Sequence, residues 1–348
     1  MKKFERVDVG YINTPLERLN NLSDYYSDVD IYIKRDDMTG LALGGNKTRK
    51  LDYIVKYALD NNYTTLLTVG GPQTNHGRLT IAAAAKFGLK SILVCDGKAP
   101  KKAQGNLILD KMMGAEVIFI DDEGRTDEQQ AIHKKEEIAK IIQEREANGE
   151  KVLDIPLGGS SAIGAYGYLQ CAKEIIDQLK EMNLKIDYLF CGYGSTGTFA
   201  GLWLGAKYFG ADFEVVGVPV FPTPFSTEHC ANLINELADN CEIDIDCKPE
   251  QLKVIGGFEN NKYAGPAYGK TNEEIREVIY QMAQQEGIIC DPCYTGKTLY
   301  GMIDSIKSPE VYNKKLLFLH TGGAPAIFAD PFAEDIQEEI WINNVIQK

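Results

Sequence analysis

Thr65-Leu66-Leu67-Thr68-Val69 is followed directly by Gly70-Gly71-Pro72-Gln73-Thr74-Asn75-His76 and then by an alanine-rich stretch, residues 79–87. This order predicts a buried strand, a glycine-rich turn and a helix. Gly88 stands where a helix C-cap is expected. Such a unit places its turn at the carboxyl end of a parallel strand, where α/β proteins bind ligands.

The alternation of strands and helices continues along the chain. Further strands are predicted at residues 91–95, 116–120, 188–191, 215–218 and 316–319, and helices at residues 107–113, 127–150 and 272–285. A second α/β run begins near Gly164, and no Pro/Ser-rich linker separates it from the first. We therefore predict the α/β class, with parallel sheets flanked by helices and a ligand site between two units.

The length and composition of the chain limit the kinds of partner that the protein is expected to bind. A length of 348 residues suggests two domains or one large one. The net charge of −13 argues against a nucleic-acid partner, which usually needs a basic face. No stretch approaches the ~20 apolar residues of a membrane span, and residues 1–5 lack the apolar run of a secretory signal. A cytoplasmic protein without a membrane partner is expected.

The eight cysteines do not suggest a disulfide scaffold in a chain of this length. Cys290 and Cys293 have C-x-x-C spacing, but no second such pair follows and the chain has only four histidines. Cys241 and Cys247 fit no common zinc spacing with them. We expect reduced structural thiols and no metal site.

Lys47 lies in Gly44-Gly45-Asn46-Lys47-Thr48-Arg49-Lys50, which opens a helix with apolar residues at helical spacing. The positive end of the helix dipole disfavours an ammonium group, and Arg49 and Lys50 add like charge. Both effects are expected to lower the pKa of Lys47 and to favour the free amine that imine formation needs. The alternative interpretation is a solvated basic turn.

Gln73, Thr74, Asn75 and His76 offer two amides, a hydroxyl and an imidazole within four residues of one turn. A purely structural turn rarely combines these side chains. This turn is therefore a candidate for ligand binding at the carboxyl end of its strand.

Gly192-Tyr193-Gly194-Ser195-Thr196-Gly197-Thr198 again joins a strand to a helix. Its N–H groups and hydroxyls at a helix N-terminus are suited to a phosphate. The glycines also satisfy G-x-G-x-x-G, so a dinucleotide is the alternative ligand. That ligand needs an acidic residue at the end of the next strand, but Asp212 and Glu214 lie at its start and residues 218–221 are Val-Pro-Val-Phe. A single phosphate fits better.

Two further turns lie near the C-terminus, Asp291-Pro292-Cys293-Tyr294-Thr295-Gly296-Lys297 and His320-Thr321-Gly322-Gly323-Ala324-Pro325. The Tyr294 ring is suited to packing against a flat ligand, and Thr295 and Thr321 offer neutral hydrogen bonds. Ordinary turns at helix starts are the other interpretation. An activated lysine, a phosphate turn and polar turns together are what a phosphate-bearing aldehyde cofactor needs, which predicts pyridoxal 5'-phosphate.

These residues resemble a known family. Lys34-Arg35-Asp36-Asp37, residues 44–50, residues 73–76 and Tyr294-Thr295-Gly296-Lys297 are similar to the D-cysteine desulfhydrases and, more loosely, to the 1-aminocyclopropane-1-carboxylate deaminases. The similarity runs from about Thr14-Pro15-Leu16 to Pro325. It implies a tryptophan-synthase-β-like (fold type II) pyridoxal-phosphate enzyme that forms a homodimer. A smaller α/β domain, residues 51–163, is expected to be inserted into a larger cofactor-binding domain of residues 1–50 and 164–348.

The resemblance also implies roles for single residues. Lys47 falls on the Schiff-base lysine, Asn75 near the cofactor's 3-hydroxyl, and Tyr294 on the aromatic residue against its ring. The remaining cofactor contacts are expected from Gly194, Ser195, Thr196, Gly197, Thr198, Thr295 and Thr321. The substrate is expected to contact Gln73, Thr74, Asn75, His76 and Tyr268, and the catalytic residues are expected to be Lys47, Thr74, Tyr268 and Tyr294.

Three threonines bear on the substrate. The deaminases usually carry Glu and Leu where this chain has Thr295 and Thr321, and a carboxylate beside the pyridine nitrogen would deepen the electron sink. The threonines therefore favour expulsion of a good β-leaving group over opening of a cyclopropane. Thr74 replaces the serine usual in the family, and its β-branch fixes the rotamer and adds a methyl group.

The expected reaction is α,β-elimination on a small amino acid, with D-cysteine giving pyruvate, hydrogen sulfide and ammonia. The alternatives are a 1-aminocyclopropane-1-carboxylate deaminase that forms 2-oxobutyrate and ammonia, and a lyase of L-cysteate or another β-substituted alanine. A non-enzymatic alternative is a phosphate-ligand binding protein in which Lys47 is only a surface lysine.

Overall fold

The computed structural model describes residues 1–259 and 261–342. Its strands are β1 (Leu16–Arg18), β2 (Asp30–Arg35), β3 (Thr65–Gly70), β4 (Lys90–Asp96), β5 (Glu116–Ile120), β6 (Val152–Ile155), β7 (Tyr188–Tyr193), β8 (Glu214–Pro219), β9 (Lys253–Val254) and β10 (Lys315–His320). Its α-helices are α1 (Asn20–Tyr26), α2 (Lys47–Asp60), α3 (Asn75–Lys86), α4 (Asn106–Met112), α5 (Asp127–Ala147), α6 (Ala162–Glu181), α7 (Gly197–Phe209), α8 (Thr227–Asn240), α9 (Glu273–Glu286), α10 (Thr295–Ser305) and α11 (Phe332–Ile336).

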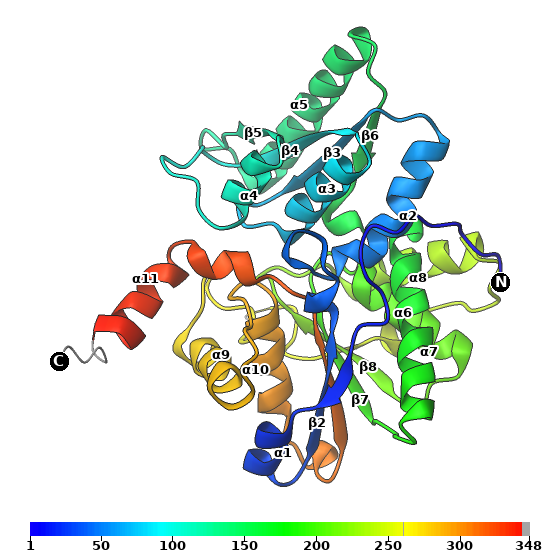
Figure 1. The fold of residues 1–348 in the computed structure, drawn as a ribbon, viewed down its shortest axis with the longest axis vertical. Helices are drawn as coiled ribbons and strands as arrows, with labels where there is room; N and C mark the ends of the chain where they lie inside the picture. Colours follow the sequence, from blue (N-terminus) through cyan, green and yellow to red (C-terminus); the bar gives the residue numbers. More distant parts are fainter. Residues whose placement is uncertain (260, 343–348) are drawn as a thin grey trace.

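Two sheets organise the chain, and Figure 1 shows them one above the other. The larger sheet has the order β1-β2-β10-β7-β8-β9 and the smaller one β5-β4-β3-β6. Every pairing is parallel except that of the edge strand β1 with β2, which is antiparallel. The predicted α/β class with parallel sheets is therefore confirmed, with β1 as an exception that the sequence did not indicate.

Both faces of the larger sheet are buried, as the near-continuous apolar strands require. Successive side chains of a strand point to opposite faces. In β10, Leu317 and Leu319 belong to the core that packs against α6, α7 and α8, whereas Leu316 and Phe318 belong to the core that packs against α1, α9 and α10. Figure 1 shows these two groups of helices on opposite sides of the sheet.

The smaller sheet is built entirely from residues 65–155. It lies within the segment predicted to be an inserted domain, whose boundaries at residues 51 and 163 stay a prediction. Residues 260 and 343–348 of the predicted larger domain lie outside the described residues. Within the described part of the chain, no helix has both the length and the apolar character needed to cross a bilayer.

Helix α2 links the two sheets. It packs against α3 beside the smaller sheet and against α6 beside the larger one, and Figure 1 shows it between the two units. Because Lys47 is its first residue, this packing places Lys47 where the two units meet.

Candidate functional site

A cleft opens at the carboxyl ends of β3, β7 and β10, between the two units. About 610 Å³ in and around the cleft, open solvent included, is not filled by protein atoms. Its lining consists of Asn46, Lys47, Thr74, Asn75, His76, Leu157, Gly158, Gly192, Gly194, Ser195, Thr196, Thr198, Val220, Phe221, Tyr294 and Thr321. All four motifs predicted from the sequence therefore contribute to one site.

Lys47 enters the cleft from the start of α2. Asn46, just before it, donates through Nδ2 to the Thr198 hydroxyl at 3.0 Å, so the lysine turn and the turn before α7 are joined directly. Lys47 Nζ makes no hydrogen bond to any of the described residues, and burial lowers its pKa to about 8. The predicted direction of this pKa shift is correct, but its cause is loss of solvent rather than repulsion from Arg49 and Lys50.

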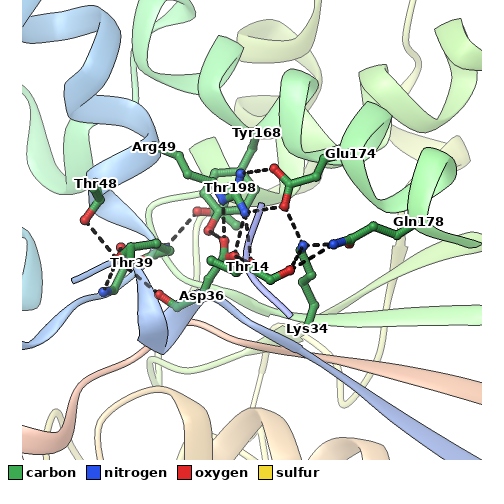
Figure 2. A network of polar contacts seen from close by, with 12 residues as sticks. Thr14, Lys34, Asp36, Thr39, Thr48, Arg49, Tyr168, Glu174, Gln178 and Thr198 are labelled. Carbon is green, nitrogen blue, oxygen red and sulfur yellow. Dashed lines mark hydrogen bonds and ion pairs between the residues drawn. The ribbon is translucent and has the colours of Figure 1, made fainter. Parts of the chain in front are cut away.

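Arg49 does not line the cleft but belongs to a buried polar network, which Figure 2 shows. Its Nε donates to Asp36 at 2.8 Å and its Nη1 to Glu174 at 2.7 Å. Glu174 also accepts from Lys34, and Asp36 accepts from the Tyr168 hydroxyl. Two cations and two carboxylates therefore balance one another and tie β2, α2 and α6 together. The idea of a solvated basic turn is wrong, since Arg49 is almost completely buried.

Lys50 lies directly behind the turn that precedes α7. Its Nζ donates to the Gly158 carbonyl at 3.0 Å, and a Cβ atom at Gly197 would lie only 2.8 Å from it. Burial, and then the neighbouring Lys47, holds the Lys50 pKa well below its ordinary value. An anion bound in the turn would favour the charged form again. Sequence reasoning treated Lys50 only as a source of like charge and missed this position.

The turn before α7 has an unusual backbone. Thr196 adopts φ +65°, a left-handed conformation that is rare for a β-branched residue and often marks a ligand site. Its Oγ1 is buried and has no hydrogen-bond partner within the described residues. Such an unpaired hydroxyl is costly unless a ligand satisfies it. Together with the N-terminus of α7, it suits a phosphate group.

The turn before α3 offers the cleft a different set of groups. Thr74 is the N-cap of α3, and its Oγ1 accepts from the Gly77 N–H at 3.1 Å. His76 lines the cleft, but its Nε2 is 2.7 Å from the Thr68 hydroxyl, and burial lowers its pKa well below the ordinary value. His76 is therefore neutral near pH 7. The Gln73 side chain is bonded to Asn106 and Gln104 and does not line the cleft.

Two tyrosines meet at the edge of the cleft. Tyr294 lines it, and its hydroxyl is 3.1 Å from that of Tyr268, which lines a neighbouring cleft together with Gln73. Burial is the main cause that raises the pKa of both phenols. Both are therefore protonated near neutral pH.

The two late threonines lie in different surroundings. Thr321 lines the cleft, and its carbonyl accepts the Asn46 N–H at 3.0 Å. Thr295 is fully buried, and its Oγ1 donates to Asp291 at 2.6 Å. Asp291 in turn accepts the N–H groups of Cys293 and Tyr294, which fixes the start of α10. The Thr295 side chain thus supports the turn and does not itself line the cleft.

Lys297 is a second buried lysine beside the site. Its Nζ donates to the carbonyls of Val220 and Ala267 at 3.2 and 3.1 Å. It thereby joins the end of β8 to the segment that carries Tyr268. Burial lowers its pKa to about 8.

None of the cysteines lines the cleft, although Cys293 lies beside Tyr268 and Tyr294. All eight are buried thiols outside any disulfide. Among residues 1–259 and 261–342, no three His, Cys, Asp or Glu side chains are grouped to hold a metal ion.

Comparison with protein families gives one match over most of the chain. The family model described as "Pyridoxal-phosphate dependent enzyme" covers residues 7–322.

Curated relatives cover nearly the whole chain. D-cysteine desulfhydrase of Serratia proteamaculans is 37% identical over 337 residues, which are 94% of this chain and 97% of the relative. A Pyrococcus abyssi protein, provisionally named 1-aminocyclopropane-1-carboxylate deaminase, is 35% identical over 329 residues, 94% of either chain.

Solved structures give the same fold. A structure described as an ACC deaminase homologue has a TM-score of 0.83 at 37% identity and covers 97% of this chain and 96% of that one. A hydrogen sulfide-producing enzyme from Fusobacterium nucleatum has a TM-score of 0.63 at 19% identity, covering 91% of this chain and 97% of that one. The second likeness concerns the fold alone.

Proposed function

This chain belongs to the pyridoxal-phosphate dependent enzyme family, and on that premise we propose that Lys47 carries the cofactor and that the cleft catalyses α,β-elimination on a small amino acid, with D-cysteine as the first candidate. The observation that carries this proposal is the position of Lys47. Its amine lies in the cleft, makes no hydrogen bond to the residues that the structure describes, and has a pKa lowered to about 8 by burial.

The residues present fit pyridoxal 5'-phosphate. The phosphate would be held by the turn of residues 194–198, where the Thr196 hydroxyl is unpaired within the described residues. Lys50 lies behind this turn, and the bound phosphate would favour its charged form. Lys47 would bind the aldehyde, Asn75 would donate to the ring oxygen, and Tyr294 would pack against the ring. These contacts span the cleft from α2 to α7.

The chain's own groups can then perform the elimination. When bound, the cofactor supplies a conjugated ring that withdraws electrons from the substrate's α-carbon. Thr74 and Asn75 bind the substrate carboxylate through the turn before α3. Lys47 Nζ takes the α-proton, and the protonated Tyr294 hydroxyl donates a hydrogen bond to the departing sulfur. The overall reaction converts D-cysteine and water to pyruvate, hydrogen sulfide and ammonia.

The absence of a carboxylate from the cleft supports elimination over cyclopropane opening. Within the described residues, the lining contains no Asp or Glu, and Thr321 offers only a neutral hydroxyl. A neutral partner cannot stabilise a protonated pyridine nitrogen as a carboxylate does. A weaker electron sink suffices for a good leaving group such as thiolate.

The deaminase remains the second candidate, because a relative at 35% identity is provisionally given that name. L-cysteate and other β-substituted alanines are further candidates with the same chemistry. We also propose a homodimer, on the resemblance to the family, which sedimentation would test.

The test begins with the cofactor. Purified protein is expected to absorb at about 420 nm, the region of a protonated pyridoxal imine. Borohydride should abolish this band. Lys47→Ala should lack the band, whereas Lys56→Ala, a lysine on the solvent side of the same helix, should keep it. A wild-type protein without the band, or a Lys47→Ala variant that keeps it, would refute the proposed role of Lys47.

Product analysis then separates the substrates. D-cysteine, L-cysteine, β-chloro-D-alanine, L-cysteate and 1-aminocyclopropane-1-carboxylate are supplied in turn. Pyruvate with sulfide from D-cysteine supports the proposal. Formation of 2-oxobutyrate from the cyclopropane, with no turnover of D-cysteine, would assign the deaminase instead.

A further inference from the structure

A buried cluster of polar side chains lies behind Asn75, on the side away from the cleft. Arg78, the fourth residue of α3, donates through Nη1 to Asn75 Oδ1 at 2.9 Å and to Asn106 Oδ1 at 2.6 Å. Asn106, at the start of α4, donates through Nδ2 to Asn75 Oδ1 at 3.1 Å and to the Gln73 carbonyl at 2.9 Å. Arg78 and Asn106 are both completely buried.

These contacts leave only one orientation for the Asn75 amide. A guanidinium has donors and no acceptor, so the atom that faces Arg78 must be the Asn75 oxygen. The same argument fixes Asn106, whose oxygen faces Arg78 and whose nitrogen must then face Asn75. The Asn75 oxygen therefore accepts two hydrogen bonds inside the protein. Its Nδ2 makes none to the described residues, and Asn75 lines the cleft.

Arg78 also holds the turn that leads into Lys47. Its Nη2 donates to the Gly44 carbonyl at 2.7 Å. One guanidinium therefore fixes both the asparagine and the lysine turn on the same side of the cleft. Burial lowers the Arg78 pKa to about 10, and the charge of nearby Asp110 opposes this change, so Arg78 is a cation near pH 7.

Asp110 lies near Arg78 without binding it directly, and burial raises the Asp110 pKa to about 7, so it balances the Arg78 charge only in part near pH 7. Both of its carboxylate oxygens and Arg78 Nε are buried and have no hydrogen-bond partner within the described residues. A charged donor at the amide oxygen polarises the amide and strengthens its N–H groups as donors. The Arg78 and Asn106 side chains therefore strengthen Asn75 Nδ2 as a hydrogen-bond donor toward the cleft.

We propose that Arg78 and Asn106 are positioning residues that hold the Asn75 amide with Nδ2 toward the cleft, so that Asn75 is a fixed donor to the ring oxygen of the bound cofactor. This inference rests on the proposed function, in which Lys47 carries that cofactor. A fixed donor stabilises the anionic ring oxygen. Loss of the donor should weaken cofactor binding and raise the pH at which the 420 nm band disappears.

The test compares Asn75→Ala, Asn106→Ala and Arg78→Lys with the wild type. Asn75→Ala is expected to raise the cofactor's dissociation constant about 3- to 10-fold, as loss of one hydrogen bond implies. It should also move the pH midpoint of the visible band upward by about half a unit or more. Asn106→Ala and Arg78→Lys should shift both quantities in the same direction, although neither residue lines the cleft.

Double variants separate positioning from general damage. If Asn106 acts through Asn75, its substitution in an Asn75→Ala background should change the midpoint and the dissociation constant no further. Arg78 also donates to the Gly44 carbonyl, so Arg78→Lys should keep a part of its effect in that background. Gln104→Ala, in the segment just before α4, is the control and should match the wild type. Circular dichroism of each variant verifies folding, and Asn106→Ala, the milder change, suffices if Arg78→Lys does not fold.

Two results would overturn the inference. One is a folded Asn106→Ala variant with the wild-type midpoint and dissociation constant. The other is a double variant whose effect equals the sum of the Asn106→Ala and Asn75→Ala effects, because Asn106 would then act independently of Asn75. A wild-type protein without the visible band would instead remove the proposed function on which the inference rests.

Discussion

The hydroxyl oxygens of Tyr268 and Tyr294 lie 3.1 Å apart, and their rings are inclined by 73°. Tyr294 lines the cleft and Tyr268 does not, so Tyr268 is placed to orient the Tyr294 hydroxyl. Because burial raises the pKa of both phenols, the pair is suited to donate a hydrogen bond rather than to act as a base near pH 7.

We predict that Tyr294→Phe lowers kcat by about 100-fold, a usual loss for a missing proton donor, and leaves the visible band intact. Tyr268→Phe should have a smaller effect, and the double variant should resemble Tyr294→Phe. The loss should be the same at pH 7 and pH 9, because neither phenol ionises in that range. Tyr312→Phe, on the surface, is the control. Independent effects that multiply in the double variant would contradict the coupling of the two hydroxyls.

The lowered pKa of Lys47 predicts how the protein captures its cofactor. With a pKa of about 8 caused by burial, the free amine rises from roughly a tenth of the molecules at pH 7 to nine tenths at pH 9. The rate at which cofactor-free protein forms the visible band should therefore increase about 10-fold over this range and level off near pH 9. An ordinary lysine would give a rate that still rises about 10-fold for each pH unit at pH 9. Stopped-flow absorbance distinguishes the two profiles.

The sequence was sufficient to predict the local parts of this site. The strand–turn–helix units around Thr74 and Thr196 follow from hydrophobic patterns over fewer than 30 residues, and their turns must lie at strand ends. The position of Lys47 at a helix start was likewise predicted from apolar spacing. The structure confirms these elements to within a few residues.

Contacts between distant segments were not predictable in this way. Lys50 lies behind Gly197, and Arg78 donates to Asn106, although the sequence between each pair contains no signal for the contact. Strand β2 was also missed, because its Lys34 and Arg35 interrupt the apolar pattern. Lys34 is buried there because Glu174, 140 residues away, pairs with it.

The network in Figure 2 predicts a large loss of stability when one charge is removed. Asp36 is completely buried; burial alone would raise its pKa, but Arg49 outweighs this and holds the pKa below its ordinary value. Asp36→Asn leaves Arg49 without this partner and should cost about 3 to 5 kcal/mol, as breaking a buried pair does. Lys173→Ala, which removes the exposed pair with Asp177, should cost about 0.5 kcal/mol or less.

Urea unfolding at pH 7 would measure both losses. Because the folded-state pKa of Asp36 is lowered, its contribution is present above the ordinary carboxyl pKa of about 4 and is lost as the pH falls through the folded-state value. The difference between the wild type and Asp36→Asn should therefore shrink in acid. A difference below about 1 kcal/mol at pH 7 would mean that the network is not a major source of stability.

We predict that Gly158→Ala disturbs the phosphate turn, residues 194–198, whereas the same substitution at Gly88 does not. Gly158 has φ +70°, and a Cβ atom there would lie 2.0 Å from Ser195 Oγ and 2.7 Å from Ser195 Cβ, so Ser195 would have to move. Gly88 has nearly the same backbone, φ +71°, with nothing within 4 Å of an added Cβ. Both alanine substitutions carry the left-handed backbone cost of about 1–2 kcal/mol. Only Gly158→Ala should also raise the cofactor's dissociation constant, by about 10-fold or more, which corresponds to about 1.4 kcal/mol. Fluorescence titration of cofactor-free protein measures this, and equal dissociation constants for the two variants would show that Ser195 does not contribute to cofactor binding.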